Sequence, residues 1–205
     1  RIQNIVPVKI LHYQEALQLA FDKISRMHVI SSWKDAISQT TMRTNFLDNI
    51  KVPEYGILTD KRIIEFEKEK SEVIENIWRI GGQRGWYFGN WLWSIRGILD
   101  KMVGGVGLRR GRRSESDLKP GDALDFWRVL VASKTSGHLL LYAEMKLPGE
   151  AWLEFRIKES KGKHQLLQTA TFQPLGLWGR IYWYLMLPFH GIIFPMMAKR
   201  IVAAK

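Results

Sequence analysis

The sequence predicts an α+β fold in which a curved antiparallel sheet is wrapped around a long C-terminal helix, preceded by a short strand-helix-strand piece. Two observations predict it. Between residues 121 and 172, four extended runs follow one another with turn residues between them, which is typical of an antiparallel meander. From Leu175 to the C-terminus the chain is apolar over a long stretch. Because a sheet with one apolar face needs a covering layer, this stretch is the natural partner of the meander.

Composition limits the classes of function. The 205 residues suit one ordinary domain plus a short appendage, and 46% hydrophobic with 25% charged residues is globular, which excludes a disordered chain and a polytopic membrane protein. A formal net charge of +11 favours anionic partners. Nucleic acid is not the expected partner, because the basic residues are dispersed and no recognition motif is present. The lack of cysteine excludes disulfides and thiolate chemistry.

Residues 1–39 have the pattern of a strand, a helix and a strand. Ile5 to Ile10 is extended, and Leu17, Phe21 and Ile24 follow at helical spacing before Val29 and Ile30. Such a piece cannot bury both of its apolar faces alone. The piece must therefore either dock on the rest of the chain or be the tail of a missing upstream domain. We divide the chain into residues 1–50, this piece with a linker, and residues 51–205, the sheet-and-helix domain.

Two helices are expected between the first strand and the meander. Residues 57–68 are extended, and a helix then follows Ser71 as its N-cap and ends at Gly81 and Gly82. The second helix carries an apolar stripe at helical spacing and ends at Gly104. That stripe comprises Leu92, Ile95, Leu99 and Met102.

The meander predicts a pair of opposed carboxylates. Its four runs span residues 122–131, 139–147, 151–157 and 165–172. If the second and third runs keep their apolar residues on one face and are joined by a three-residue turn, residues 148–150, then Met145 lies opposite Leu153 and Glu144 lies opposite Glu154. Opposed carboxylates favour a shared proton or a cation, and so a catalytic or metal role. The alternative is a solvated charge network that includes Arg128, Lys146 and Arg156 on the outer face.

The C-terminal segment, residues 181–198, has a borderline length for a membrane span. Pro188 and Pro195 interrupt its hydrogen bonding, which favours a kinked helix buried in a globular core over a spanning or an interfacial helix. Tyr182 and Tyr184 suit either a membrane interface or a pocket wall.

Several side chains are candidates to bind a ligand. The aromatic residues that suit a cavity wall, with simple core packing as the alternative for most of them, are Trp127, Trp152, Trp178, Tyr182, Trp183 and Tyr184. His190 is the one strongly polar side chain of its segment, and it suits either a ligand contact with acid-base chemistry near neutral pH or a satisfied core position. The basic loop with Arg109, Arg110, Arg112 and Arg113 suits an anionic headgroup, with a solvated loop as the alternative.

The strings GWYFGNWLW, DKMVGGVGLRRGRR, GDALDFWRV, AEMKLPGEAWLEF and YWYLMLPFHGIIF resemble a domain-of-unknown-function family of the helix-grip (START or Bet v 1-like) type. That family lies C-terminal to NAD(P)-binding, nucleoside-diphosphate-sugar epimerase-like proteins of the short-chain dehydrogenase type. Residues 1–39 resemble the last strand, helix and strand of such a domain. The resemblance therefore implies NAD(P) only in the missing upstream domain and no cofactor in this chain. It implies no catalytic residues.

These observations together predict a binding module for an apolar or amphipathic small molecule, with an anionic group as an option. One alternative is the catalytic half-site of a short-chain-dehydrogenase-like enzyme that uses the Glu144/Glu154 pair or His190. The other is a membrane-surface module that uses the C-terminal helix and the basic loop. The expected partners are the small ligand, the upstream NAD(P)-binding domain and, in the last alternative, a membrane surface. Since no secretory signal is visible, the expected location is cytoplasmic or membrane-associated.

Overall fold

The computed structural model describes residues 12–15, 18, 52–82, 84–105, 107, 112–160 and 162–204. The chain divides into two compact units, residues 1–46 and 47–205. In the first unit, residues 13–15 form a helical turn. Most of the predicted N-terminal strand-helix-strand piece lies outside the described residues and stays a prediction. The second unit carries the fold and the site.

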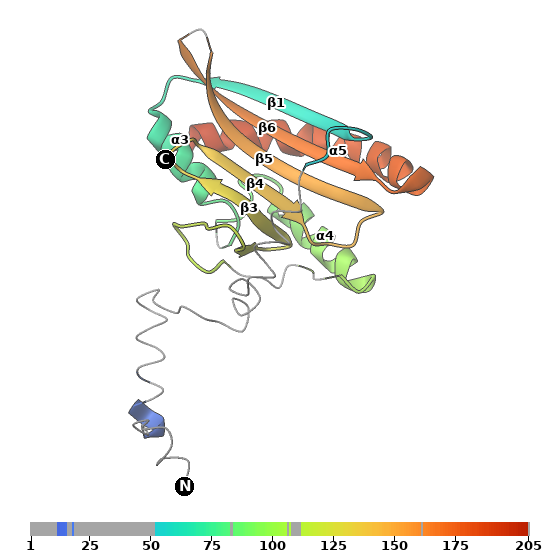
Figure 1. Ribbon diagram of the computed structural model, residues 1–205, viewed down its shortest axis with the longest axis horizontal. Coiled ribbons are helices and arrows are strands. Elements are labelled where there is room, and N and C mark those ends of the chain that lie inside the picture. Colours follow the sequence, from blue (N-terminus) through green and yellow to red (C-terminus); the bar gives the residue numbers. More distant parts are fainter. Residues whose placement is uncertain are drawn as a thin grey trace. The chain divides into compact units, whose positions relative to one another are not determined.

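One six-stranded antiparallel sheet forms the body of the second unit, with the strand order β1-β6-β5-β4-β3-β2 (Figure 1). Its strands are β1 (Leu58–Phe66), β2 (Ala123–Leu124), β3 (Trp127–Ser133), β4 (His138–Ala143), β5 (Gly149–Ser160) and β6 (Lys163–Pro174). The first strand pairs with the last, so the meander from β3 to β6 is extended by β1 beside β6. The predicted meander is thus confirmed.

Alternation along the strands places one apolar face toward the core. Leu139, Leu141 and Ala143 of β4 are buried, and Leu153 and Phe155 of β5 pair with the first two across the ladder. The side chains between them point to the opposite face. This face of the sheet therefore supplies one wall of the hydrophobic core.

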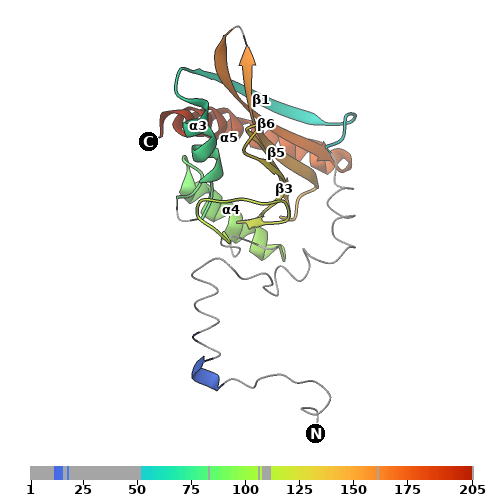
Figure 2. The same ribbon diagram turned by 60° about the vertical axis from the view of Figure 1, so that its left-hand side comes forward.

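Helix α5 (Gly176–Ala203) crosses the apolar face of the sheet and packs on β6 and β1 (Figures 1 and 2). Its buried residues include Phe194, Met197 and Ile201. Pro188 and Pro195 both lie inside the helix. The predicted sheet wrapped around a long C-terminal helix is confirmed, and this arrangement is the helix-grip architecture.

Helix α3 (Lys70–Trp78) and the residues just before it hydrogen-bond the C-terminal end of α5. The Asn76 amide donates hydrogen bonds of 3.0 Å to the carbonyls of Ile201 and Ala204, and Lys68 Nζ donates to that of Ala204 at 3.0 Å. These bonds satisfy carbonyls that a helix end leaves without partners. The prediction that Ser71 is the N-cap is wrong, because Ser71 lies inside the helix and Glu69 occupies the cap position.

Helix α4 (Asn90–Met102) buries the face beside its predicted apolar stripe. Trp93, Gly97 and Asp100 are its buried residues. The stripe itself is largely open to solvent, with Leu99 56% and Met102 77% exposed. Packing in the hydrophobic core therefore does not account for the apolar residues of this stripe.

Candidate functional site

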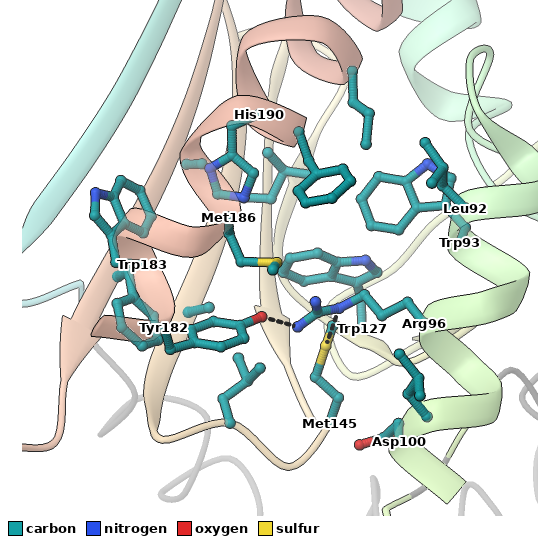
Figure 3. A pocket seen from close by; sticks show the side chains of 18 of the residues that line it. Leu92, Trp93, Arg96, Asp100, Trp127, Met145, Tyr182, Trp183, Met186 and His190 are labelled. Atoms are coloured by element: carbon teal, nitrogen blue, oxygen red, sulfur yellow. Dashed lines mark hydrogen bonds between the residues drawn. The ribbon is translucent and has the colours of Figure 1, made fainter. Parts of the chain in front are cut away.

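A cavity of about 400 Å³ lies between the apolar face of the sheet, α4 and α5. This volume is within the usual range of small-molecule sites. Figure 3 shows the side chains of α4 and α5 converging on it from opposite sides, with Trp127 of β3 between them. The two helices are about 80 residues apart in the sequence, so the cavity exists only in the folded chain.

Aromatic rings form much of the wall. Trp93 of α4 and Trp127 of β3 belong to one packed group with Trp86 and Phe126, in which ring centroids lie 5.1 to 6.5 Å apart. From α5, Trp183 stacks on Phe172 of β6. The indole Nε1 of Trp127 is buried without a hydrogen-bond partner among the described residues. The wall is therefore rigid and apolar, with a free donor at Trp127.

Arg96 places a positive charge in this apolar wall. Its Nη2 donates to the Tyr182 hydroxyl of α5 at 2.5 Å, its Nε lies 2.9 Å from the sulfur of Met145, and its guanidinium lies over the Tyr182 ring (Figure 3). Within the described residues, Arg96 forms no ion pair with a carboxylate. Since the Tyr182 oxygen accepts from Arg96, the hydroxyl proton remains available for a ligand.

Asp100, one turn from Arg96, binds backbone amides rather than the Arg96 guanidinium. Its carboxylate accepts hydrogen bonds of 2.8 Å from the amides of Gly107 and Lys146. A carboxylate bound by two amides is well satisfied. Asp100 thus fastens two loops to α4, and it leaves the charge of Arg96 uncompensated.

His190 of α5 is a neutral polar group of the cavity. Its ring stacks on Phe194 with centroids 4.5 Å apart and meets Trp183 edge-on at 5.2 Å. Burial lowers the pKa of His190 to about 4. The imidazole is therefore uncharged near neutral pH. Its Nδ1 is buried without a partner in the described part of the chain.

The other predicted ligand contacts divide into three groups. Trp127 and Trp152 line the cavity, as do Tyr182 and Trp183. The predictions for Tyr184 and Trp178 are wrong, because these side chains are 61% and 76% exposed and lie outside the wall. Arg109 and Arg110 lie outside the described residues, so their contact with an anionic headgroup stays a prediction. Of the other two arginines of that loop, Arg112 instead donates to the carbonyls of Trp78, Ile80 and Ser114, and Arg113 pairs with Asp122.

The predicted Glu144/Glu154 pair does not form. Glu154 lies opposite Leu140, and Glu144 follows the end of β4. Glu144 pairs with Arg128 at 2.9 Å, whereas Glu154 accepts from His138 and Arg156, each at 2.8 Å. The hydrogen bond from His138, together with the charge of Arg156, lowers the pKa of Glu154.

The physical reason is the connection between the two strands. The prediction assumed a three-residue turn, but the chain leaves β4 after Ala143 and enters β5 at Gly149. The Glu144 amide donates to the Phe126 carbonyl at 2.9 Å, and Asp100 holds the Lys146 amide. No group of acidic and histidine side chains in the described ranges could hold a metal ion.

Sequence reasoning missed Arg96 as a site residue. The sequence did hold an indication of this role, because Arg96 lies one turn from both Leu92 and Asp100, beside the predicted apolar stripe of the same helix. A lone guanidinium beside such a stripe is unfavourable in a core but useful in a binding wall. Its partner Tyr182 was predicted as a wall residue.

Comparisons with solved structures give distant similarities only. Norcoclaurine synthase from Thalictrum flavum is 8% identical with a TM-score of 0.42, over 72% of this chain and 85% of that one. Ara h 8.0201 is 9% identical with a TM-score of 0.38, over 72% and 99%. Protein Ms6760 from Mycobacterium smegmatis is 14% identical with a TM-score of 0.37, over 75% and 93%.

The comparison with curated proteins gives no match. The comparison with family profiles matches residues 56–197 to a family described as protein of unknown function (DUF2867). The matched range begins just before β1 and ends within α5, so it includes every strand of the sheet and the whole cavity wall. The chain belongs to the DUF2867 family.

Proposed function

We propose that this chain binds a small amphipathic molecule whose apolar body fills the cavity and whose anionic group contacts Arg96. The observation that carries the proposal is the guanidinium of Arg96, placed in an aromatic and aliphatic wall without a carboxylate partner among the described residues. Few other groups of the wall are charged. Binding sites of this kind take apolar bodies and fix their orientation by a few polar groups.

The anionic group of the ligand has a defined set of donors. Arg96 offers the N–H groups that are not used by Tyr182 and Met145, and the Tyr182 hydroxyl offers its proton. A guanidinium binds carboxylate, sulfonate or phosphate oxygens in a fixed planar geometry. The Nδ1 of His190 and the Nε1 of Trp127 supply further polar contacts deeper in the wall.

A pair of matched dyes tests the role of the charge. 8-Anilinonaphthalene-1-sulfonate carries an aromatic body with an anionic group, and N-phenyl-1-naphthylamine has the same body without it. The variant Arg96→Gln should bind the sulfonate about 10 to 100 times more weakly, because a hydrogen bond to a charged group contributes on the order of 1.5–3 kcal/mol. The neutral dye should bind equally well to both proteins.

The surface variant Arg180→Gln is the control, since Arg180 is exposed and lies outside the cavity wall. Like Arg96→Gln it removes one positive charge, but from the exposed surface of α5 and not from the cavity wall. Equal losses of sulfonate binding in Arg96→Gln and Arg180→Gln would show a nonspecific charge effect and would contradict the proposal. Fluorescence titration of the two dyes against the wild type and the two variants gives the six dissociation constants.

We further propose that the module accompanies an NAD(P)-binding, epimerase-like domain in a longer protein. The support is the resemblance of residues 1–39 to the end of such a domain. NADPH titration, followed by its fluorescence, should show binding to a chain extended by the upstream domain and none to residues 1–205. Binding of NADPH to the shorter chain would contradict this part of the proposal.

A further inference from the structure

The surface around the cavity mouth is unusually apolar for a protein exposed to water. On α4, Trp91, Ile98, Leu99 and Met102 are exposed, and on α5 so are Leu177, Trp178, Tyr184, Leu185, Phe189 and Ile192. Leu99 and Phe189 also line the cavity, so the apolar surface is continuous with the wall inside. We call these ten residues the apolar rim. Large exposed apolar patches mark interaction sites.

The charges beside the apolar rim are almost all of one sign. Apart from Arg96, which lies in the cavity wall, helices α4 and α5 hold four basic residues: Lys101, Arg180, Lys199 and Arg200. Their one acidic residue is Asp100, which is buried and bound by backbone amides. The rim is therefore apolar and positively charged, which complements a surface that is apolar and negatively charged.

We propose that the apolar rim docks on the surface of a membrane that contains anionic lipids. Exposed Trp91, Trp178 and Tyr184 suit the boundary between headgroups and acyl chains, where aromatic side chains with a polar atom are favoured. Lys101 and Arg180 lie beside them for the lipid charges. Membrane attachment by buried apolar area plus basic residues is typical of surface-bound helices.

A second copy of the chain fits this surface less well. In a two-fold dimer the same patch meets itself. Lys101 and Arg180 would then approach their own copies, and neither helix has an exposed carboxylate to pair with them. Like charges brought together in an interface oppose association.

A membrane-spanning role for α5 fits the structure poorly as well. Among the described residues, α5 is the one helix long and apolar enough to cross a membrane. It nevertheless supplies Phe194, Met197 and Ile201 to the core and its C-terminal carbonyls to Asn76. Removing the helix into a bilayer would expose the apolar face of the sheet to water.

Docking in this orientation would determine the route by which the ligand enters the cavity. This step rests on the proposed function. The mouth of the cavity would face the lipid, and an amphipathic molecule could pass from the bilayer into the cavity without crossing water. Arg96 would then meet the anionic group as the apolar body enters. The surface thus identifies the ligand class as a membrane-derived amphipathic anion.

Vesicle flotation of the 205-residue chain tests the docking. We expect the wild type to float with phosphatidylcholine vesicles that contain phosphatidylserine, less so at high salt, and weakly with phosphatidylcholine alone. Reversal of two charges by Lys101→Glu with Arg180→Glu should lower partitioning at least about 25-fold, because each basic residue near an anionic surface contributes about 1 kcal/mol. Trp178→Ser with Leu185→Ser should also abolish flotation.

Matched controls lie outside α4 and α5, with Lys61, Ile63 and Lys158 on the outer face of the sheet and Tyr55 just before β1. Lys61→Glu with Lys158→Glu makes the same change in net charge, and Tyr55→Ser with Ile63→Ser removes two exposed apolar side chains elsewhere. Both should float as the wild type does. Near-ultraviolet circular dichroism confirms that each variant is folded.

Two results would overturn the inference. One is a wild type that does not bind anionic vesicles, or that binds them equally after the rim and the control substitutions. The other is a dimer in sedimentation analysis that Trp178→Ser with Leu185→Ser converts to a monomer, which would make the rim an interface between copies. Arg96→Gln separates the two proposals, because it should float normally while losing the sulfonate dye.

Discussion

At the scale of single residues, the cavity wall combines one uncompensated charge with polar groups that stay neutral. Asp100 is only four residues from Arg96, yet its carboxylate is held by the amides of Gly107 and Lys146. Tyr182 is the neighbour that orients the guanidinium, and it does so without neutralising it. The positive charge of Arg96 is therefore available to a ligand, because no carboxylate of the described residues pairs with it.

His190 gives a prediction about pH. The native imidazole stays neutral down to a pKa of about 4, whereas an unfolded histidine takes up a proton near 6.5. Between these values the unfolded chain binds more protons, so the free energy of unfolding should fall as the pH falls. The groups that act on this titration are Asp60 and Arg62 of β1 and Arg96 of α4, besides the burial itself.

Urea unfolding at a series of pH values measures this effect. Relative to His190→Gln, the wild type should lose about 3 kcal/mol of stability between pH 6.5 and pH 4. Both proteins share the carboxylates that titrate in the same range, including Glu154, so their difference isolates the histidine. Parallel curves for the two proteins would mean that His190 is exposed to water in solution.

At the scale of elements, the strands were predictable and their register was not. Alternating apolar residues and the turns at Gly137 and Gly162 mark β4, β5 and β6 in the sequence. The β4/β5 register depends on Asp100, which holds the connection from a helix more than 40 residues away. Such a tertiary contact leaves no periodic signal, so the expected Glu144/Glu154 pair was wrong.

The position of α5 depends on a close approach at Gly179. A Cβ atom there would lie 2.4 Å from the Pro148 carbonyl oxygen and 2.8 Å from Pro174, both parts of the backbone framework. Gly179→Ala should therefore lower the free energy of unfolding by about 1–3 kcal/mol, as overpacking does. The loss should appear in urea unfolding monitored by tryptophan fluorescence.

Gly191 of the same helix is the matched control, because a Cβ atom there would meet nothing within 4 Å. Gly191→Ala should raise the free energy of unfolding by about 0.5–1 kcal/mol through helix propensity. If the two alanine variants had equal stability, α5 would not pack against Pro148 and Pro174 as described.

At the scale of the whole molecule, the order of elements predicts the architecture and only part of the site. The meander and the apolar C-terminal segment are local patterns, which is why the sheet gripping a helix could be foreseen. Trp127, Trp152 and His190 were predicted as ligand contacts because aromatic and histidine side chains are easily recognised within apolar segments. The cavity itself arises where α4 and α5 meet, and the sequence does not show that the apolar stripe of α4 lies at its mouth.

The described part of the chain therefore presents a basic, apolar surface that opens into a cavity with the guanidinium of Arg96 in its wall. The closest test of this central claim is native mass spectrometry of the gently purified wild type and Arg96→Gln, with identification of any molecule released on denaturation. We predict one amphipathic anion per wild-type chain, largely lost from Arg96→Gln. A stoichiometric neutral molecule retained equally by both proteins would contradict the role of Arg96 and, with it, the account of the site.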